Sequence, residues 1–226
     1  MARLFDDASS QFLEVDATPV TAIPFTIAGW FRSDSATAGQ VMMWIGDKDV
    51  ADHYWLLRAA GNIAGDPVRI QRAAGGTNAN TDTTTGYTAG TWHHAAAVFT
   101  TAIDVSVYID GGSEGNGIAS REPLNADRVS IGRAGDSTPD SYFSGDLMEW
   151  AIWNVALSDA EVLSLVTAAY PGMVQPSALV RYWPILGQFD PEVDMIAASN
   201  LTVTGATRSE HRHSNRRWGA LAGVGI

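Results

Sequence analysis

Hydrophobic residues recur along most of this chain in short stretches, with turn-forming residues between them. In residues 25–31 (FTIAGWF), positions 25, 27, 29 and 31 point to one face of an extended chain, and the residues between them point to the other. Further strands are predicted at 54–60, 68–73, 92–99, 104–110, 128–132, 147–153, 178–185 and 201–205. Residues 77–85, rich in threonine and asparagine, predict a loop or an exposed edge strand. The pattern indicates an all-β protein.

One helix is predicted near residues 158–168. Ser158-Asp159-Ala160-Glu161 has the spacing of a capping box, in which the serine and the glutamate satisfy each other's backbone N–H groups. Apolar residues then repeat at helical spacing from Val162 to Val166, and Pro171 ends the pattern.

Four segments carry a family resemblance: Phe25–Phe31, Trp92–Thr100, Val105–Gly111 and Tyr142–Leu165. Together they resemble the strand and helix signatures of the laminin-G-like, concanavalin A-like jelly-roll family, of the type encoded by tailed bacteriophages. The resemblance implies a jelly-roll sandwich of two antiparallel sheets with one short helix. Lectins, adhesion modules, glycanase relatives and viral surface proteins share this fold, so the resemblance leaves the function open.

Composition is consistent with one large domain. The chain has 226 residues, of which 46% are hydrophobic and 17% charged, so it has material for a core and little sign of disorder. It contains no cysteine, which excludes disulfides and thiol chemistry. The net charge of −11 argues against nucleic-acid binding, because phosphate contacts need a basic surface.

The C-terminal segment differs from the rest of the chain. We predict a jelly-roll domain over residues 1–205 and a basic tail over 206–226. The tail contains four arginines and one acidic residue. Arginine and tryptophan are enriched where proteins bind one another. The candidate interface residues of the tail are Arg208, His211, Arg212, His213, Arg216, Arg217 and Trp218.

Glycanases of this fold need an E-x-D-x-x-E motif, which sets two carboxylates across the scissile bond. Glu14-Val15-Asp16 is followed by Pro19 where the last glutamate should stand, and Glu192-Val193-Asp194 is followed by Ala197. We therefore predict that the protein is not an enzyme and has no catalytic residues. His93 and His94 are adjacent in a strand, so they face opposite sides and are predicted to be structural.

Calcium is the ion that the sequence favours, and no other cofactor is predicted. Residues 132–141 (GRAGDSTPDS) offer carboxylates and carbonyls, and the resemblance to pentraxin-like relatives suggests Asp136 and Asp140 as calcium ligands. The next strand departs from the family's usual G-x-I-D-E pattern, because Met148 replaces the acidic residue.

Two functions follow from the resemblance. The first is a non-enzymatic virion protein of a tailed phage, which decorates a capsid or fibre and assembles with itself or the shell through its tail. The N-terminus lacks a signal-peptide pattern and no segment is apolar enough to cross a membrane, so we expect a virion location, with the cytoplasm as the alternative. The second function is a lectin-like module that binds cell-surface glycans, with or without calcium. It requires an exposed aromatic platform, for which Trp44, Trp55 and Tyr87 are the open candidates.

Overall fold

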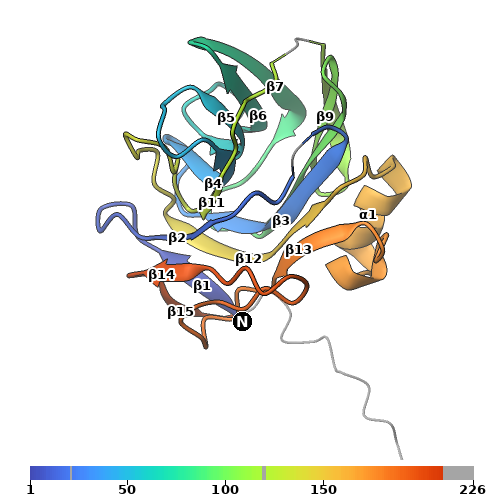
Figure 1. The fold of residues 1–226 in the computed structure, drawn as a ribbon. Coiled ribbons are helices and arrows are strands. Elements are labelled where there is room, and N and C mark those ends of the chain that lie inside the picture. Colours follow the sequence, from blue (N-terminus) through green and yellow to red (C-terminus); the bar gives the residue numbers. More distant parts are fainter. Residues whose placement is uncertain (21, 119–120, 211–226) are drawn as a thin grey trace, which may run out of the picture.

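The computed structural model describes residues 1–20, 22–118 and 121–210, which form two antiparallel sheets packed face to face (Figure 1). The eight-stranded sheet contains, in spatial order, β10 (Gly112–Gly117), β9 (Asp104–Ile109), β8 (His93–Thr101), β3 (Phe25–Ser33), β12 (Gly145–Trp153), β1 (Ala2–Phe5) and β15 (Thr207–Ser209), with β13 (Leu179–Trp183) also paired to β12. The seven-stranded sheet contains β14 (Thr202–Thr204), β2 (Phe12–Asp16), β11 (Arg128–Ile131), β4 (Gly39–Gly46), β5 (His53–Ala60), β6 (Pro67–Ala74) and β7 (Thr77–Gly86). The predicted all-β sandwich is confirmed.

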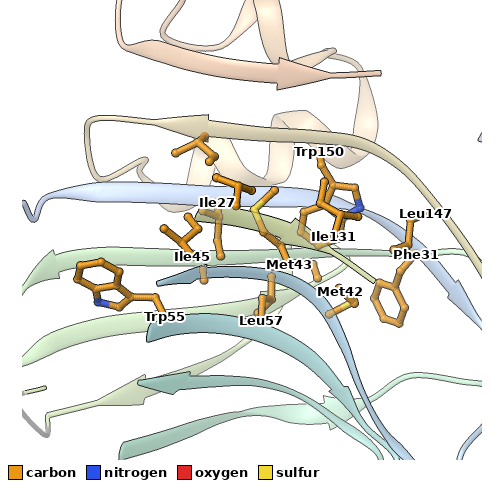
Figure 2. Close-up of a cluster of buried hydrophobic side chains, with 14 of the residues drawn as sticks. Ile27, Phe31, Met42, Met43, Ile45, Trp55, Leu57, Ile131, Leu147 and Trp150 are labelled. Carbon is orange, nitrogen blue, oxygen red and sulfur yellow. The ribbon is translucent and has the colours of Figure 1, made fainter. Parts of the chain in front are cut away.

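The core lies between the two sheets and is built by alternation along each strand (Figure 2). In β5, Trp55 and Leu57 point inward and pack among the buried residues, whereas Tyr54 and Arg58 point outward. Fully burying one large apolar side chain contributes roughly 1.5–3 kcal/mol. The inner faces therefore hold the sheets together, and the outer faces are free to differ.

Strand β12 is split by a β-bulge at Glu149, whose φ is 56°. Residues Gly145–Leu147 pair with β1, and residues Trp150–Trp153 pair with β13. The two shorter strands therefore follow one another along the same edge of β12.

A buried ion pair ties the N-terminal strand to the C-terminal part of the described chain. Arg3 donates from Nε to Glu192 at 2.7 Å, and the amides of Leu186 and Gly187 donate to the same carboxylate. Strand β15 pairs with β1, and Ala206 is buried in the core. Residues 206–209, which the sequence analysis assigned to the tail, therefore pack with the sandwich.

The two sheets approach each other closely along one edge of the sandwich, where β7 meets β10. A Cβ at Gly115 would lie 1.7 Å from the carbonyl oxygen of Asp82, so only glycine permits this approach. Strand β7 is the edge strand that residues 77–85 allowed. The sequence analysis predicted no strand at the positions of β1, β2, β4, β10 and β15.

Around Trp153, the outer face of the eight-stranded sheet is apolar and covered. Helix α1 (Asp159–Thr167) and the short 3-10 helix η1 (Pro171–Met173) follow β12, and α1 lies on the side of this sheet (Figure 1). Val162 and Leu165 of the helix pack onto Trp153, whose indole N–H donates to the carbonyl of Val174 at 2.8 Å. The helix begins at the predicted capping box, in which the Ser158 amide donates to Glu161 at 2.8 Å.

Candidate functional site

The outer face of the seven-stranded sheet carries a row of polar side chains, which we call the outer-face polar row: Tyr54 and Arg58 of β5, Asn62 of the following turn, and Gln71 of β6. Arg58 donates from Nη2 to Asn62 Oδ1 at 2.8 Å and from Nη1 to Gln71 Oε1 at 3.5 Å. Gln71 in turn donates to the Tyr54 hydroxyl at 2.7 Å. Four polar groups are thereby fixed across two neighbouring strands.

The strand register explains why these groups meet. Leu56 of β5 pairs with Gln71 of β6, and Arg58 pairs with Arg69. Residues two apart on a strand share a face, so Tyr54 and Arg58 reach Gln71 diagonally. Gly39 of β4 leaves room for the guanidinium, because a Cβ there would lie 1.8 Å from Nη2 of Arg58.

A charged pair lies beside the polar row. Arg69 donates from Nε and Nη2 to the two carboxylate oxygens of Asp82 on β7, at 2.6 and 2.7 Å. This two-bond geometry is the strong form of an arginine–carboxylate pair. Arg69 and Asp82 therefore neutralise each other.

A loop over residues 132–141 covers the other part of this outer face. Ala134 of the loop packs in a small apolar cluster with Trp44 and Tyr54. A Cβ at Gly135 would lie 2.7 Å from Cβ of Ser130 and 3.2 Å from the Trp44 ring, so the loop sits directly on the sheet. The loop therefore covers Tyr54 at one end of the polar row, whereas Arg58 and Gln71 stay partly exposed.

Burial and neighbouring charges both shift the pKa values of the ionisable groups in the polar row. Burial raises the pKa of Tyr54; the hydrogen bond from Gln71 opposes this change, and Asp136 and Asp140 add to it. Burial also lowers the pKa of Arg58; Arg69 acts in the same direction, and Asp140 acts against both. The row is therefore a partly desolvated set of donors with carboxylates nearby.

The two predicted calcium ligands lie in the covering loop. Asp136 is buried and accepts hydrogen bonds from the Thr138 amide and hydroxyl, at 2.8 and 3.3 Å. Asp140 is exposed, and its backbone carbonyl accepts from the Ala134 amide. Calcium takes six to eight oxygen ligands, and the described ranges contain no group of three or more His, Cys, Asp or Glu side chains that could hold a metal ion. The pair therefore lacks a third acidic ligand, and calcium binding stays a prediction.

None of the three open candidates for an aromatic platform lies on the surface. Trp44 is fully buried, and Trp55 and Tyr87 are 4% exposed. Tyr54, which the sequence did not single out, is the aromatic member of the polar row, and it is itself only 8% exposed. The signal that marks it is the alternation in Tyr54–Arg58 (YWLLR), which places a tyrosine and an arginine on the face opposite Trp55 and Leu57.

The incomplete E-x-D pairs are engaged in structural contacts. Glu14 accepts from Arg133 at 2.6 Å, and Asp16 accepts from Arg128 at 2.7 Å. Glu192 holds Arg3, and Asp194 accepts from the amides of Tyr182, Ile196 and Ser199.

His93 and His94 point to opposite sides of β8. His93 Nδ1 lies 2.7 Å from Asp110, and its Nε2 accepts from the Thr88 amide at 3.0 Å. His94 is buried, with its ring 5.0 Å from the Trp30 ring. Both histidines have structural contacts.

Of the predicted interface residues, only Arg208 falls within the described part of the chain. It is exposed on β15 and pairs with Arg3 of β1 in the strand register. The remaining six, His211, Arg212, His213, Arg216, Arg217 and Trp218, lie outside the described residues.

A hollow of about 220 Å³ on the eight-stranded sheet is the rival site. It is lined in part by Arg32, Asp34 and Asp146. Arg32 donates from Nε to Asp146 at 2.8 Å, and Ser144 donates to Asp34 at 2.6 Å. The cation of this hollow is paired with a carboxylate, whereas Arg58 of the polar row forms no ion pair within the described residues, so the outer-face polar row is the stronger candidate.

The fold and this open face define a lectin-like β-sandwich. A protein-family model, that of the concanavalin A-like lectin/glucanases superfamily, matches residues 7–163, and the chain belongs to this superfamily. No curated protein matches the chain. Within the described residues, no helix is long and apolar enough to cross a membrane.

Solved structures share the fold at low sequence identity. A Bacteroides ovatus protein to which carbohydrate binding has been ascribed is 19% identical, with a TM-score of 0.69; the match covers 94% of this chain and 60% of that one. A heptameric SAP-like pentraxin from Limulus polyphemus is 12% identical over 92% of this chain and 94% of its own, with a TM-score of 0.61. The CBM40 of a Ruminococcus gnavus sialidase, bound to α2,3-sialyllactose, is 14% identical over 74% of this chain and 97% of its own, with a TM-score of 0.57.

Proposed function

We propose that this protein is a non-catalytic carbohydrate-binding module and that its ligand lies on the outer face of the seven-stranded sheet. The observation that carries the proposal is the outer-face polar row, in which hydrogen bonds fix Arg58, Gln71 and Tyr54. Arg58 and Gln71 are partly exposed, and Tyr54 is buried beside them. Sugar hydroxyls both donate and accept hydrogen bonds, so a pre-arranged row of donors and acceptors suits them. Membership of a lectin-like superfamily and the carbohydrate-binding relatives support this reading.

The test is a glycan array followed by calorimetric titration of the strongest ligand. We expect Gln71→Ala to weaken binding at least about tenfold, a loss of roughly 1.4 kcal/mol, because the row loses its central side chain. Gln188→Ala is the matched control, since Gln188 is exposed and contacts Met1 instead. Failure of every glycan to bind, or equal loss in both variants, would contradict the proposal.

Calcium dependence is a second question about the same face. Calcium bound by Asp136 and Asp140 would stabilise the folded protein in proportion to its occupancy. A melting temperature that rises with calcium in the wild type, but not in Asp140→Asn, would support the site. An unchanged melting temperature in millimolar calcium would contradict it.

The virion interpretation depends on the tail, and most of the tail lies outside the described residues. The relatives support the carbohydrate-binding reading instead. Assembly through residues 206–226 remains a prediction, which light scattering on the full chain and on a chain ending at Glu210 would test. That truncation point keeps β15, which the sandwich needs. Loss of a closed oligomer on truncation would support the tail's role.

A further inference from the structure

Two arginines on the outer face of the seven-stranded sheet, Arg58 and Arg69, differ in how their charge is balanced. Arg69 makes two hydrogen bonds to the Asp82 carboxylate. Arg58 forms no ion pair with any residue of the described ranges, and it donates hydrogen bonds to the neutral side chains of Gln71 and Asn62. Arg58 is also partly buried, so its charge is poorly solvated. A partly buried cation without a counter-ion favours the approach of an anion.

The hydrogen bonds of this part of the row are also incomplete. The Nε–H of Arg58 is buried and has no acceptor, and its Nη1 contact to Gln71 is long at 3.5 Å. The Tyr54 hydroxyl accepts from Gln71 and has its own hydrogen left to donate. Unused donors therefore outnumber unused acceptors in the row, which suits a ligand group that only accepts.

We propose that the preferred ligand is an acidic sugar whose carboxylate contacts Arg58 and Tyr54. This inference rests on the carbohydrate-binding function proposed above and names its ligand class. A carboxylate is planar and accepts two parallel N–H bonds from a guanidinium, so it matches Arg58 in charge and in shape. Gly39 lets the guanidinium lie against β4 in this position, because a side chain there would displace it.

The surroundings of Arg58 fit the rest of such a sugar. Asp140 of the covering loop is exposed and lies close enough to act on the pKa of both Arg58 and Tyr54. Asn80 of β7 is exposed and pairs with Gln71 in the strand register. These side chains supply acceptors for the hydroxyl groups of the sugar, while Arg58 takes the carboxylate.

The experiment compares each acidic sugar with its own methyl ester, which removes the charge and keeps the shape. The probes are a galacturonic acid trisaccharide and 3′-sialyllactose, each titrated as free acid and as ester. For at least one sugar, we expect the acid to bind at least about tenfold more tightly than the ester. The Arg58→Gln variant should bind the acid about tenfold or more weakly than the wild type does, and its affinity for the ester should change little.

Two further variants separate a specific contact from a change in net charge. Arg69→Gln removes the same charge from the same face, and we expect the preference for the acid to survive because Arg69 is already paired with Asp82. Gly39→Ala should fold, since the clashing atoms are the flexible ends of Arg58 and Asn62, yet it should reduce the preference for the acid. Melting temperatures establish that each variant is folded.

The outcomes distinguish this inference from the proposed function. If acids and esters bind equally, or if Arg58→Gln keeps the preference, the ligand class is wrong while carbohydrate binding stands. If Arg69→Gln weakens binding of the acid as much as Arg58→Gln does, the effect is one of overall charge and the inference is overturned. If neither these probes nor a broad glycan array shows binding, the proposed function fails and the inference fails with it.

Discussion

The outer faces of the two sheets have opposite characters, although their inner faces follow one pattern. The outer face of the eight-stranded sheet presents Ala28, Ala96 and Trp153, and α1 covers it. The outer face of the seven-stranded sheet presents Tyr54 and Arg58, and the loop over 132–141 shields part of it. One face holds a second hydrophobic core, and the other carries the outer-face polar row on which we propose that a ligand binds. Substitutions on the first face should therefore affect stability, and substitutions on the second should affect binding.

The largest effect is expected from Trp153→Ala on the covered face. Trp153 is fully buried under α1, and removing a tryptophan from a core costs about 3–5 kcal/mol. Urea unfolding should report this loss, while glycan affinity of the folded fraction stays unchanged. Asn80→Ala on the open face is the comparison, with an expected change within about 0.5 kcal/mol because the side chain is exposed. Similar losses in both variants would contradict the contrast between the faces.

A smaller effect is expected where the loop meets the open face. Gly135→Ala would place a Cβ 2.7 Å from Cβ of Ser130, so the loop must shift away from Trp44. Such overpacking costs about 1–3 kcal/mol, which chemical denaturation would measure. Increased acrylamide quenching of tryptophan fluorescence should accompany it. Gly112→Ala is the matched control, because a Cβ there meets nothing within 4 Å.

Strand alternation predicted the sandwich but not the site. In Tyr54–Arg58 the alternation separates an inner face from an outer one, and the inner residues Trp55 and Leu57 follow the general rule that apolar side chains are buried. That rule does not say whether an outer face is covered, since coverage depends on where α1 and the loop fold back. The sequence therefore left Trp44 open as a platform, and the structure places it beneath the loop.

Strand β4 and the contact between Arg58 and Gln71 show a second limit of prediction from the sequence. The run Gly39–Gly46 (GQVMMWIG) is almost continuously apolar and lacks the alternation of a half-buried strand, because both of its faces are covered. The contact of Arg58 with Gln71 depends on the pairing register of β5 with β6, which periodicity alone does not fix. Both features required the three-dimensional pairing.

Tyr54→Phe tests the open face with the removal of one hydroxyl. We expect binding of the preferred sugar to fall by about tenfold, because the row loses a donor to the ligand. Stability should fall by only about 1 kcal/mol, since the Gln71 amide loses one acceptor. Calorimetry and urea unfolding measure the two effects separately. A large loss of stability without a change in binding would mean that Tyr54 stabilises the fold and does not contact the ligand.

The smallest expected effect is a difference in tyrosine titration between the two faces. Burial raises the pKa of Tyr54 above 10.0, its ordinary value, and the hydrogen bond from Gln71 opposes the rise. Burial also raises the pKa of Tyr182, and there Glu149 adds to the rise, because the Tyr182 hydroxyl donates to that carboxylate. A tyrosine whose pKa is raised on folding stabilises the protein fully below pH 10 and loses that contribution as the pH rises through its folded value.

We therefore expect Tyr54 to ionise before Tyr182 as the pH rises above 10, the ordinary tyrosine value. Absorbance at the tyrosinate band, recorded for the wild type, Tyr54→Phe and Tyr182→Phe, assigns each step by difference. Because Gln71 donates to the Tyr54 oxygen, it stabilises the ionised form, whereas Glu149 repels it at Tyr182. The reverse order would mean that the contacts with Gln71 and Glu149 do not decide which tyrosine ionises first.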